Sequence, residues 1–168
     1  LFSPIFFSNA MEEEWFPDSQ PEAVKQRSAL ASMLLFACWG PGSFIFSALG
    51  DAYGRKPLAY AALSATAAFG ALTAISPSFY IYALLRALLG FSIGGLTVGY
   101  VLVVEWLTPA ENSRVTLVLN VGYCAFTLIL IAVAAAGDAL SLGWRTQQAA
   151  VAAVLALPLC LVGVALES

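Results

Sequence analysis

The sequence contains no histidine and few charged residues. Charged side chains make up 10% of it, whereas soluble domains contain roughly 25%. Hydrophobic residues make up 61%, so a soluble chain of this length would lack the polar side chains that cover a surface. Without histidine the chain also lacks the commonest metal ligand and the commonest general base. The composition therefore excludes an ordinary soluble domain and argues against an enzyme.

Cysteine and basic residues are also scarce. The three cysteines, Cys38, Cys124 and Cys160, each lie within an apolar run, and their spacing suits neither a zinc site nor a disulfide framework. We interpret them as small buried apolar residues. No basic patch indicates a nucleic-acid partner. Because the sequence also has no nucleophile–base pair, phosphate loop or metal cluster, we predict no catalytic residue, no cofactor and no metal site.

What the chain does contain is long apolar runs. A spanning helix needs about 20 mostly apolar residues, and backbone groups in lipid are satisfied within helices. Five stretches qualify or come close, and we predict membrane helices over residues 29–49, 58–75, 79–107, 115–136 and 149–166. The expected fold is an all-α, multi-pass bundle in a lipid bilayer, preceded by a loop over residues 1–28. Since the chain opens without methionine and stops after an apolar run, we expect an interior fragment.

The connections between these runs are short and carry charge. The predicted loops cover Gly50 to Pro57, Ser76 to Ser78, Thr108 to Arg114, and Gly137 to Gln148. In the first loop, Gly50 and Gly54 give the flexibility that a tight turn needs. Asp51 can lie beside helix-end amides, and Arg55, followed by Lys56, offers a planar fork for a carboxylate. Taken alone, this loop reads as a solvated turn.

The third run carries a cation and glycines on one helix face. Arg86, Gly90 and Gly94 recur every four residues, and glycine at that spacing lets two membrane helices approach closely. The glycines alone indicate packing. A cation about two turns into a span usually faces a cavity or a partner, although it can also extend to the interface. We favour the interior placement for Arg86.

Glu105 closes the same run. It lies 19 residues after Arg86, which places the two charges about 28 Å apart in a helix, so Glu105 must pair elsewhere. The cations on its own side of the membrane are Arg55, Lys56 and Arg114. We predict one charge network at this membrane face, a form of two-state latch, with the members Asp51, Gly54, Arg55, Lys56, Glu105 and Arg114.

These motifs resemble those of a known transporter family. The Asp51-x-x-Gly54-Arg55-Lys56 turn resembles the signature loop of the major facilitator superfamily, and Arg86-x-x-x-Gly90-x-x-x-Gly94 resembles its fourth-helix motif. The stretches 99–106 and 143–148, with the closing Leu166-Glu167-Ser168, resemble the organic cation and anion transporters of solute carrier family 22. Glu14-Trp15 is similar to that family's Glu-Trp pair ahead of its second helix. The resemblance covers about residues 29–168.

The resemblance implies helices two to six of a twelve-helix fold. The chain would form part of the N-terminal half, and its partners would be helix one and the C-terminal half of the same transporter. Charge alone does not orient the chain, because each side holds three cations. The family's loop between helices two and three is cytoplasmic, which would place residues 51–57, residues 108–114 and Ser168 in the cytosol. Residues 1–28 would then be the end of the family's large extracellular loop. Substrate would bind between the halves, with alternating access.

Two positions depart from the family pattern. Ser47 stands where the family usually has glycine, and Ala52 stands where a basic residue usually follows the aspartate. The predicted latch therefore has one cation fewer than usual. This departure raises an alternative function, in which the protein is a divergent receptor or scaffold with little transport.

The leading hypothesis is alternating-access transport of a small organic ion across the plasma membrane. A sugar porter of the same superfamily is a further alternative, against which the Gly143-Trp144-Arg145 and Leu166-Glu167-Ser168 elements argue. For the substrate cavity we predict Tyr100, Asn120 and Tyr123, although helix packing explains the two tyrosines equally well. Within the predicted spans no carboxylate lies at mid-membrane, so the partner of an organic cation would come from other helices.

Overall fold

The computed structural model describes residues 15–16, 21–105, 107–140 and 143–154. Its helices are α2 (Pro21–Tyr53), α3 (Arg55–Ala74), α4 (Phe79–Glu105) and α5 (Pro109–Ala139), and residues 144–154 are also helical. α2, α3, α4 and α5 are each long and apolar enough to cross a membrane. The described residues include no strand. The expected all-α, multi-pass membrane bundle is thus confirmed.

The helices extend beyond the apolar runs that revealed them. α2 begins at Pro21 rather than at Ala29, α5 begins at Pro109 rather than at Val115, and the last helical segment begins at Trp144 rather than at Ala149. Hydropathy marks only the part of a helix that faces lipid, whereas backbone hydrogen bonding continues into the polar ends. Of the predicted fifth span, residues 149–154 are helical, and the rest lies outside the described residues.

The connection predicted as a loop from Gly50 to Pro57 is much shorter in the structure. α2 continues through Asp51 to Tyr53, and α3 starts at Arg55, so the chain reverses around Gly54. Gly54 has a φ of 93°, and its N–H donates to the carbonyl of Gly50 at 3.0 Å. Glycine populates positive φ without steric cost, so this residue allows the abrupt reversal. The loop prediction was wrong because Gly50 lies inside the helix.

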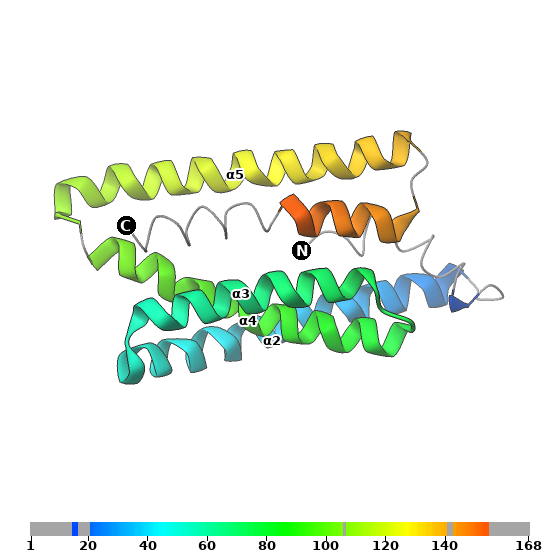
Figure 1. The fold of residues 1–168 in the computed structure, drawn as a ribbon, viewed down its shortest axis with the longest axis horizontal. Helices are drawn as coiled ribbons and strands as arrows, with labels where there is room; N and C mark the ends of the chain where they lie inside the picture. The colour runs from blue at the N-terminus through cyan, green and yellow to red at the C-terminus, as the bar shows by residue number, and fades with distance from the viewer. Residues whose placement is uncertain (1–14, 17–20, 106, 141–142, 155–168) are drawn as a thin grey trace.

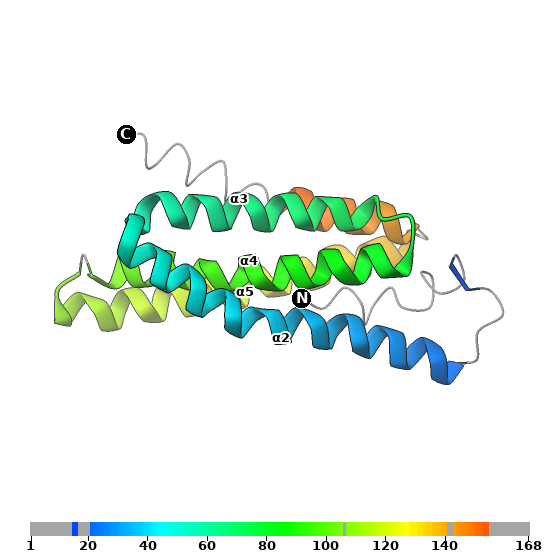
Figure 2. The ribbon, with the colours of Figure 1, turned by 90° about the horizontal axis from the view of Figure 1, so that it is seen from below.

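α4 is the central helix of the described bundle. It packs most extensively against α2 and next against α3, as Figures 1 and 2 show from two sides. In Figure 1, α5 runs apart from these three helices, with residues 144–154 between it and α3. α5 is also the least buried of the four spans. The described residues therefore form a tight three-helix unit, a fourth span that contacts it little, and the short helical segment of residues 144–154.

Glycines allow the close approach of α2 and α4. A Cβ atom on Gly90 would collide with the carbonyl of Leu35, and one on Gly42 would collide with the carbonyl of Phe91. A Cβ on Gly94 would meet the backbone of Trp39 and Ser43. These atoms are backbone atoms, which cannot rotate away. The fourth-helix glycines therefore set the distance between α2 and α4, in the manner of small-residue contacts in membranes.

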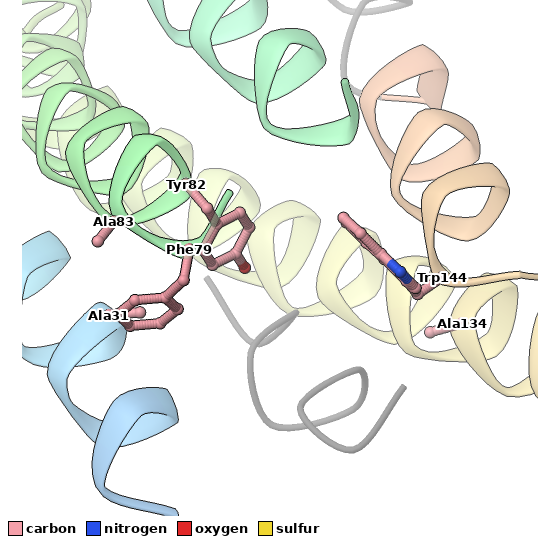
Figure 3. Packing of buried hydrophobic residues seen from close by; sticks show 6 residues of the cluster. All are labelled: Ala31, Phe79, Tyr82, Ala83, Ala134 and Trp144. Atoms are coloured by element: carbon pink, nitrogen blue, oxygen red, sulfur yellow. The ribbon is translucent and has the colours of Figure 1, made fainter. Parts of the chain in front are cut away.

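A cluster of aromatic and small residues joins the helices at the end of the bundle opposite Gly54. We call this end the Trp144 end. Figure 3 shows Phe79, Tyr82 and Ala83 of α4 near Ala31 of α2, with Trp144 near Ala134 of α5. Trp15 and Phe16, which precede α2, pack against this cluster. The Trp144 end therefore brings together residues from α2, α4, α5, the helical segment of residues 144–154 and the residues before α2.

Candidate functional site

The end of the bundle around Gly54, which we call the Gly54 end, carries an ion-pair network centred on Arg55. Its Nη2 donates to Asp51 Oδ1 at 3.1 Å, and its Nη1 donates to Glu105 Oε1. Asp51 lies in the last turn of α2, Arg55 is the first residue of α3, and Glu105 is the last residue of α4. One planar guanidinium thus binds the ends of three helices, a task that suits its rigid fork of donors.

Local geometry explains why these three groups meet. Asp51 and Arg55 are four residues apart, and the reversal at Gly54 keeps them within reach of one another. Gly50 lets α4 approach, since a Cβ there would lie 3.3 Å from Val98. Glu105 then ends α4 beside the start of α3. The packing of the glycine-rich helices therefore places the carboxylate of Glu105 beside the guanidinium of Arg55.

The exposure of the three side chains sets the strength of this network. The relative exposure is 27% for Arg55, 65% for Asp51 and 50% for Glu105. Exposed ion pairs contribute about 0.2–1 kcal/mol each. The network therefore adds little to the stability of a whole protein, but it is large enough to shift an equilibrium between two conformations.

The other two cations of the predicted network, Lys56 and Arg114, lie at exposed positions on α3 and α5. Lys56 is exposed in the first turn of α3. Arg114 is exposed on α5, and among the described residues it makes no ion pair. The structure thus brings together Asp51, Arg55 and Glu105 but leaves Arg114 outside their contacts.

Arg86 is fully inside the described bundle, with 1% of its surface exposed. Its Nε and Nη2 donate to the hydroxyl of Tyr82 at 2.9 and 2.6 Å. Its guanidinium carbon also lies 5.0 Å from the centre of the Tyr82 ring. This burial favours the interior placement over extension to the membrane interface. The pairing was missed from the sequence, although the spacing of four residues from Tyr82 to Arg86 could have indicated it.

The three predicted cavity residues lie on exposed surfaces of α4 and α5. Tyr100 is 45% exposed, and its hydroxyl is 3.3 Å from that of Thr116 on α5. Asn120 is exposed and donates its amide to the Thr116 carbonyl at 2.8 Å. Tyr123 is 59% exposed. Tyr100 and Asn120 thus share Thr116 as a neighbour, and their role in binding remains a prediction.

A second polar cluster, at the Trp144 end, was not predicted. The buried amide of Gln148 donates to the buried hydroxyl of Thr73 at 2.9 Å. Arg145 donates to the Ser76 carbonyl at 3.4 Å. Gln147 packs against Gly137, where a Cβ would lie 2.7 Å from the Gln147 side chain. These contacts tie residues 144–154 to α3 and α5, and only the tertiary structure reveals them.

The Gln148–Thr73 contact yields a stability prediction. Replacing Thr73 with valine leaves the Gln148 amide buried without its acceptor, which should lower the free energy of unfolding by about 1–3 kcal/mol. The double variant Thr73→Val/Gln148→Leu should recover part of this loss, because both polar partners are gone. Thermal unfolding of the purified full-length protein measures both effects. The control is Thr127→Val, because the Thr127 hydroxyl bonds, within the described part of the chain, only the Tyr123 carbonyl of its own helix. An equal loss there would contradict the assignment.

Taken together, the long apolar helices define a multi-pass membrane protein, and comparisons with known proteins identify its family. The family described as "Sugar (and other) transporter" matches residues 3–168. The chain is 38% identical over 84 residues to "Organic anion transporter 3" of Oryctolagus cuniculus, which is 49% of this chain and 15% of that protein. It is 36% identical over 72 residues to "Organic cation transporter-like protein" of Drosophila melanogaster, 42% of this chain and 13% of that protein.

A third relative is "Solute carrier family 22 member 15-like" of Xenopus tropicalis, at 32% identity over 105 residues, which is 60% of this chain and 22% of that protein. The chain thus spans less than a quarter of the length of these relatives. It belongs to the sugar (and other) transporter family, within the major facilitator superfamily. The resemblance to solute carrier family 22 is confirmed by these relatives.

Proposed function

We propose that the protein transports a small organic ion across the plasma membrane by alternating access. The observation that carries this proposal is the position of Arg55, which bridges acids at the ends of α2 and α4 from the start of α3. A bridge between helix ends can break and re-form as the bundle rocks, which is the requirement for a conformational latch. The family and the names of the relatives support transport and the organic-ion substrate class.

In this proposal the Gly54 end faces the cytoplasm. The Arg55 network holds the cytoplasmic ends of α2, α3 and α4 together in one state of the cycle. Substrate occupies a cavity between this half and a second half of the transporter, and Tyr100, Asn120 and Tyr123 line it. Their exposed placement on α4 and α5 leaves them available to a solute. No bond of the substrate is broken, and the protein is not an enzyme.

The receptor or scaffold remains the second candidate, because one position of the network is altered. Ala52 is exposed directly beside Asp51, where a basic side chain would add a further ion-pair partner. With Ala52, Arg55 bears the contacts to both acids among the described residues. A weaker latch would suit a protein that binds a ligand but cycles slowly.

Uptake by proteoliposomes that contain the full-length protein tests these candidates. The probes are benzoate as an organic anion, tetraethylammonium as an organic cation, and glucose. Transport of organic ions predicts saturable uptake of benzoate or tetraethylammonium above that of empty vesicles. Binding of either ion without uptake would overturn the transport proposal in favour of a receptor. Uptake of glucose alone would favour a sugar porter.

A further inference from the structure

Trp15 lies between two helix faces at the Trp144 end. Its ring centroid is 5.9 Å from that of Tyr82 on α4 and 5.2 Å from that of Trp144, the latter in an edge-on arrangement. Both neighbours are buried, with 1% and 5% of their surfaces exposed. Trp15 therefore packs between two aromatic side chains, Tyr82 and Trp144, although it precedes α2 and does not belong to a spanning helix.

The same two helix faces carry polar groups next to these aromatic side chains. Arg86 follows Tyr82 by four residues, and Gln148 follows Trp144 by four residues, so each pair shares one face of its helix. Arg86 is 1% exposed and Gln148 is 5% exposed. The site of Trp15 thus has aromatic rings on two sides and, one helical turn further along each helix, a guanidinium and a carboxamide.

The polar atoms around Trp15 are not fully satisfied by the described residues. The indole Nε1 of Trp15 and the Oε1 of Gln148 are buried without a hydrogen-bond partner. Within the described ranges, Arg86 donates only to the Tyr82 hydroxyl, through Nε and Nη2. In the described part of the chain no carboxylate pairs with this buried cation. A buried guanidinium with donors to spare is a site for an anion.

We propose that Trp15 is a removable plug, and that an aromatic carboxylate takes its place. The aromatic ring of the solute would lie between Tyr82 and Trp144, where the indole lies now. Its carboxylate would accept hydrogen bonds from the N–H groups of Arg86 that Tyr82 leaves unused. The indole suits a displaceable role because buried tryptophan normally bonds its N–H, and here that donor has no acceptor among the described residues.

This binding site is separate from the cavity proposed on Tyr100, Asn120 and Tyr123, and its test does not require transport. Benzoate binding to the purified full-length protein is measured at equilibrium by calorimetry, with benzamide as the neutral probe of the same shape. Replacing Trp15 with alanine removes the plug, and the apparent affinity for benzoate should rise by about tenfold if the plug is in place nine-tenths of the time. Benzamide should bind more weakly than benzoate to both proteins, since it lacks the charge that Arg86 recognises.

The control variant is Trp39→Ala, which removes an equally large ring that stacks on Phe36 of α2. It should leave the affinity for benzoate unchanged. Equal affinities of the wild-type protein and of Trp15→Ala for benzoate would overturn the proposal, as would equal affinities of Trp15→Ala for benzoate and benzamide. If another part of the protein supplied an anion to Arg86, benzoate would bind the wild-type protein and Trp15→Ala with equal affinity.

A second measurement uses the wild-type protein and a variant that keeps a ring at position 15. Saturating benzoate should shift the tryptophan emission to longer wavelength, because the indole of Trp15 moves from a partly buried position into water. The shift should disappear in Trp15→Phe, which retains the packing of an aromatic ring. No shift in the wild-type protein, or an undiminished shift in Trp15→Phe, would overturn the plug even if Trp15→Ala failed to fold.

Discussion

Replacing Gly90 with leucine should prevent α2 and α4 from packing, so that the full-length protein no longer accumulates as a folded species. The reason is the backbone contact between the helices, where even a Cβ on Gly90 would collide with the Leu35 carbonyl. Excess volume in a packed core costs about 1–3 kcal/mol when side chains can adjust. Here the obstacle is backbone, so the helices themselves must separate. Since whole domains are stable by about 5–15 kcal/mol, that separation is expected to be decisive.

The measurement is the yield of monodisperse protein on size-exclusion chromatography, together with its thermal unfolding midpoint. Gly90→Ala should give a folded protein with a clearly lowered midpoint. The control is Gly70→Ala on α3, where a Cβ would have no neighbour within 4 Å and where alanine favours the helix. A wild-type midpoint for Gly90→Leu would contradict the observed approach of α2 and α4.

The sequence predicted the class of fold well because a bilayer restricts the possible structures. Apolar runs of spanning length can form only helices or a closed barrel in lipid, so α3 and α4 could be located from hydropathy. The helix ends were predicted less well. Polar residues such as those from Pro109 to Arg114 continue α5, although hydropathy assigns them to a loop. Hydropathy reports the surrounding solvent, whereas helix ends depend on capping and on tertiary contacts.

The candidate site was predicted unevenly for a similar reason. The need of Glu105 for a cation at its own end followed from helix geometry, and the structure supplies Arg55. The burial of Arg86 followed from its depth in the span. By contrast, the contacts of Trp15 with Tyr82 and of Gln148 with Thr73 join segments more than 60 residues apart. No local spacing encodes such pairs, so only the packed bundle reveals them.

Replacing Arg55 with alanine should slow transport by about tenfold while leaving substrate affinity nearly unchanged, provided that the Arg55 network is a latch. Two exposed ion pairs are lost, each contributing up to about 1 kcal/mol. Since 1.4 kcal/mol corresponds to a tenfold change in an equilibrium, the balance between the two conformations should shift by about that factor. Arg55→Lys keeps one charge but loses the fork that reaches two acids, so its rate should be intermediate.

The initial rate of uptake of a transported probe ion, and its equilibrium binding, are measured on the same preparations. Hydrogen exchange at the Gly54 amide, which donates to Gly50, should accelerate in Arg55→Ala as the helix ends separate. Arg114→Ala is the matched comparison, because it removes the same charge at this end of the bundle without breaking an ion pair among the described residues. Its effect on the rate should be smaller.

Glu105→Gln distinguishes a latch from a general effect of charge at the membrane surface. It removes the ion pair between α3 and α4 but leaves that between Arg55 and Asp51. If the two acids act through one guanidinium, Arg55→Ala combined with Glu105→Gln should slow uptake no more than Arg55→Ala alone, since interacting residues give non-additive effects. Additive losses would show that Glu105 acts independently of Arg55. A loss of binding with a normal rate of cycling would place Arg55 in the substrate site and end the latch assignment.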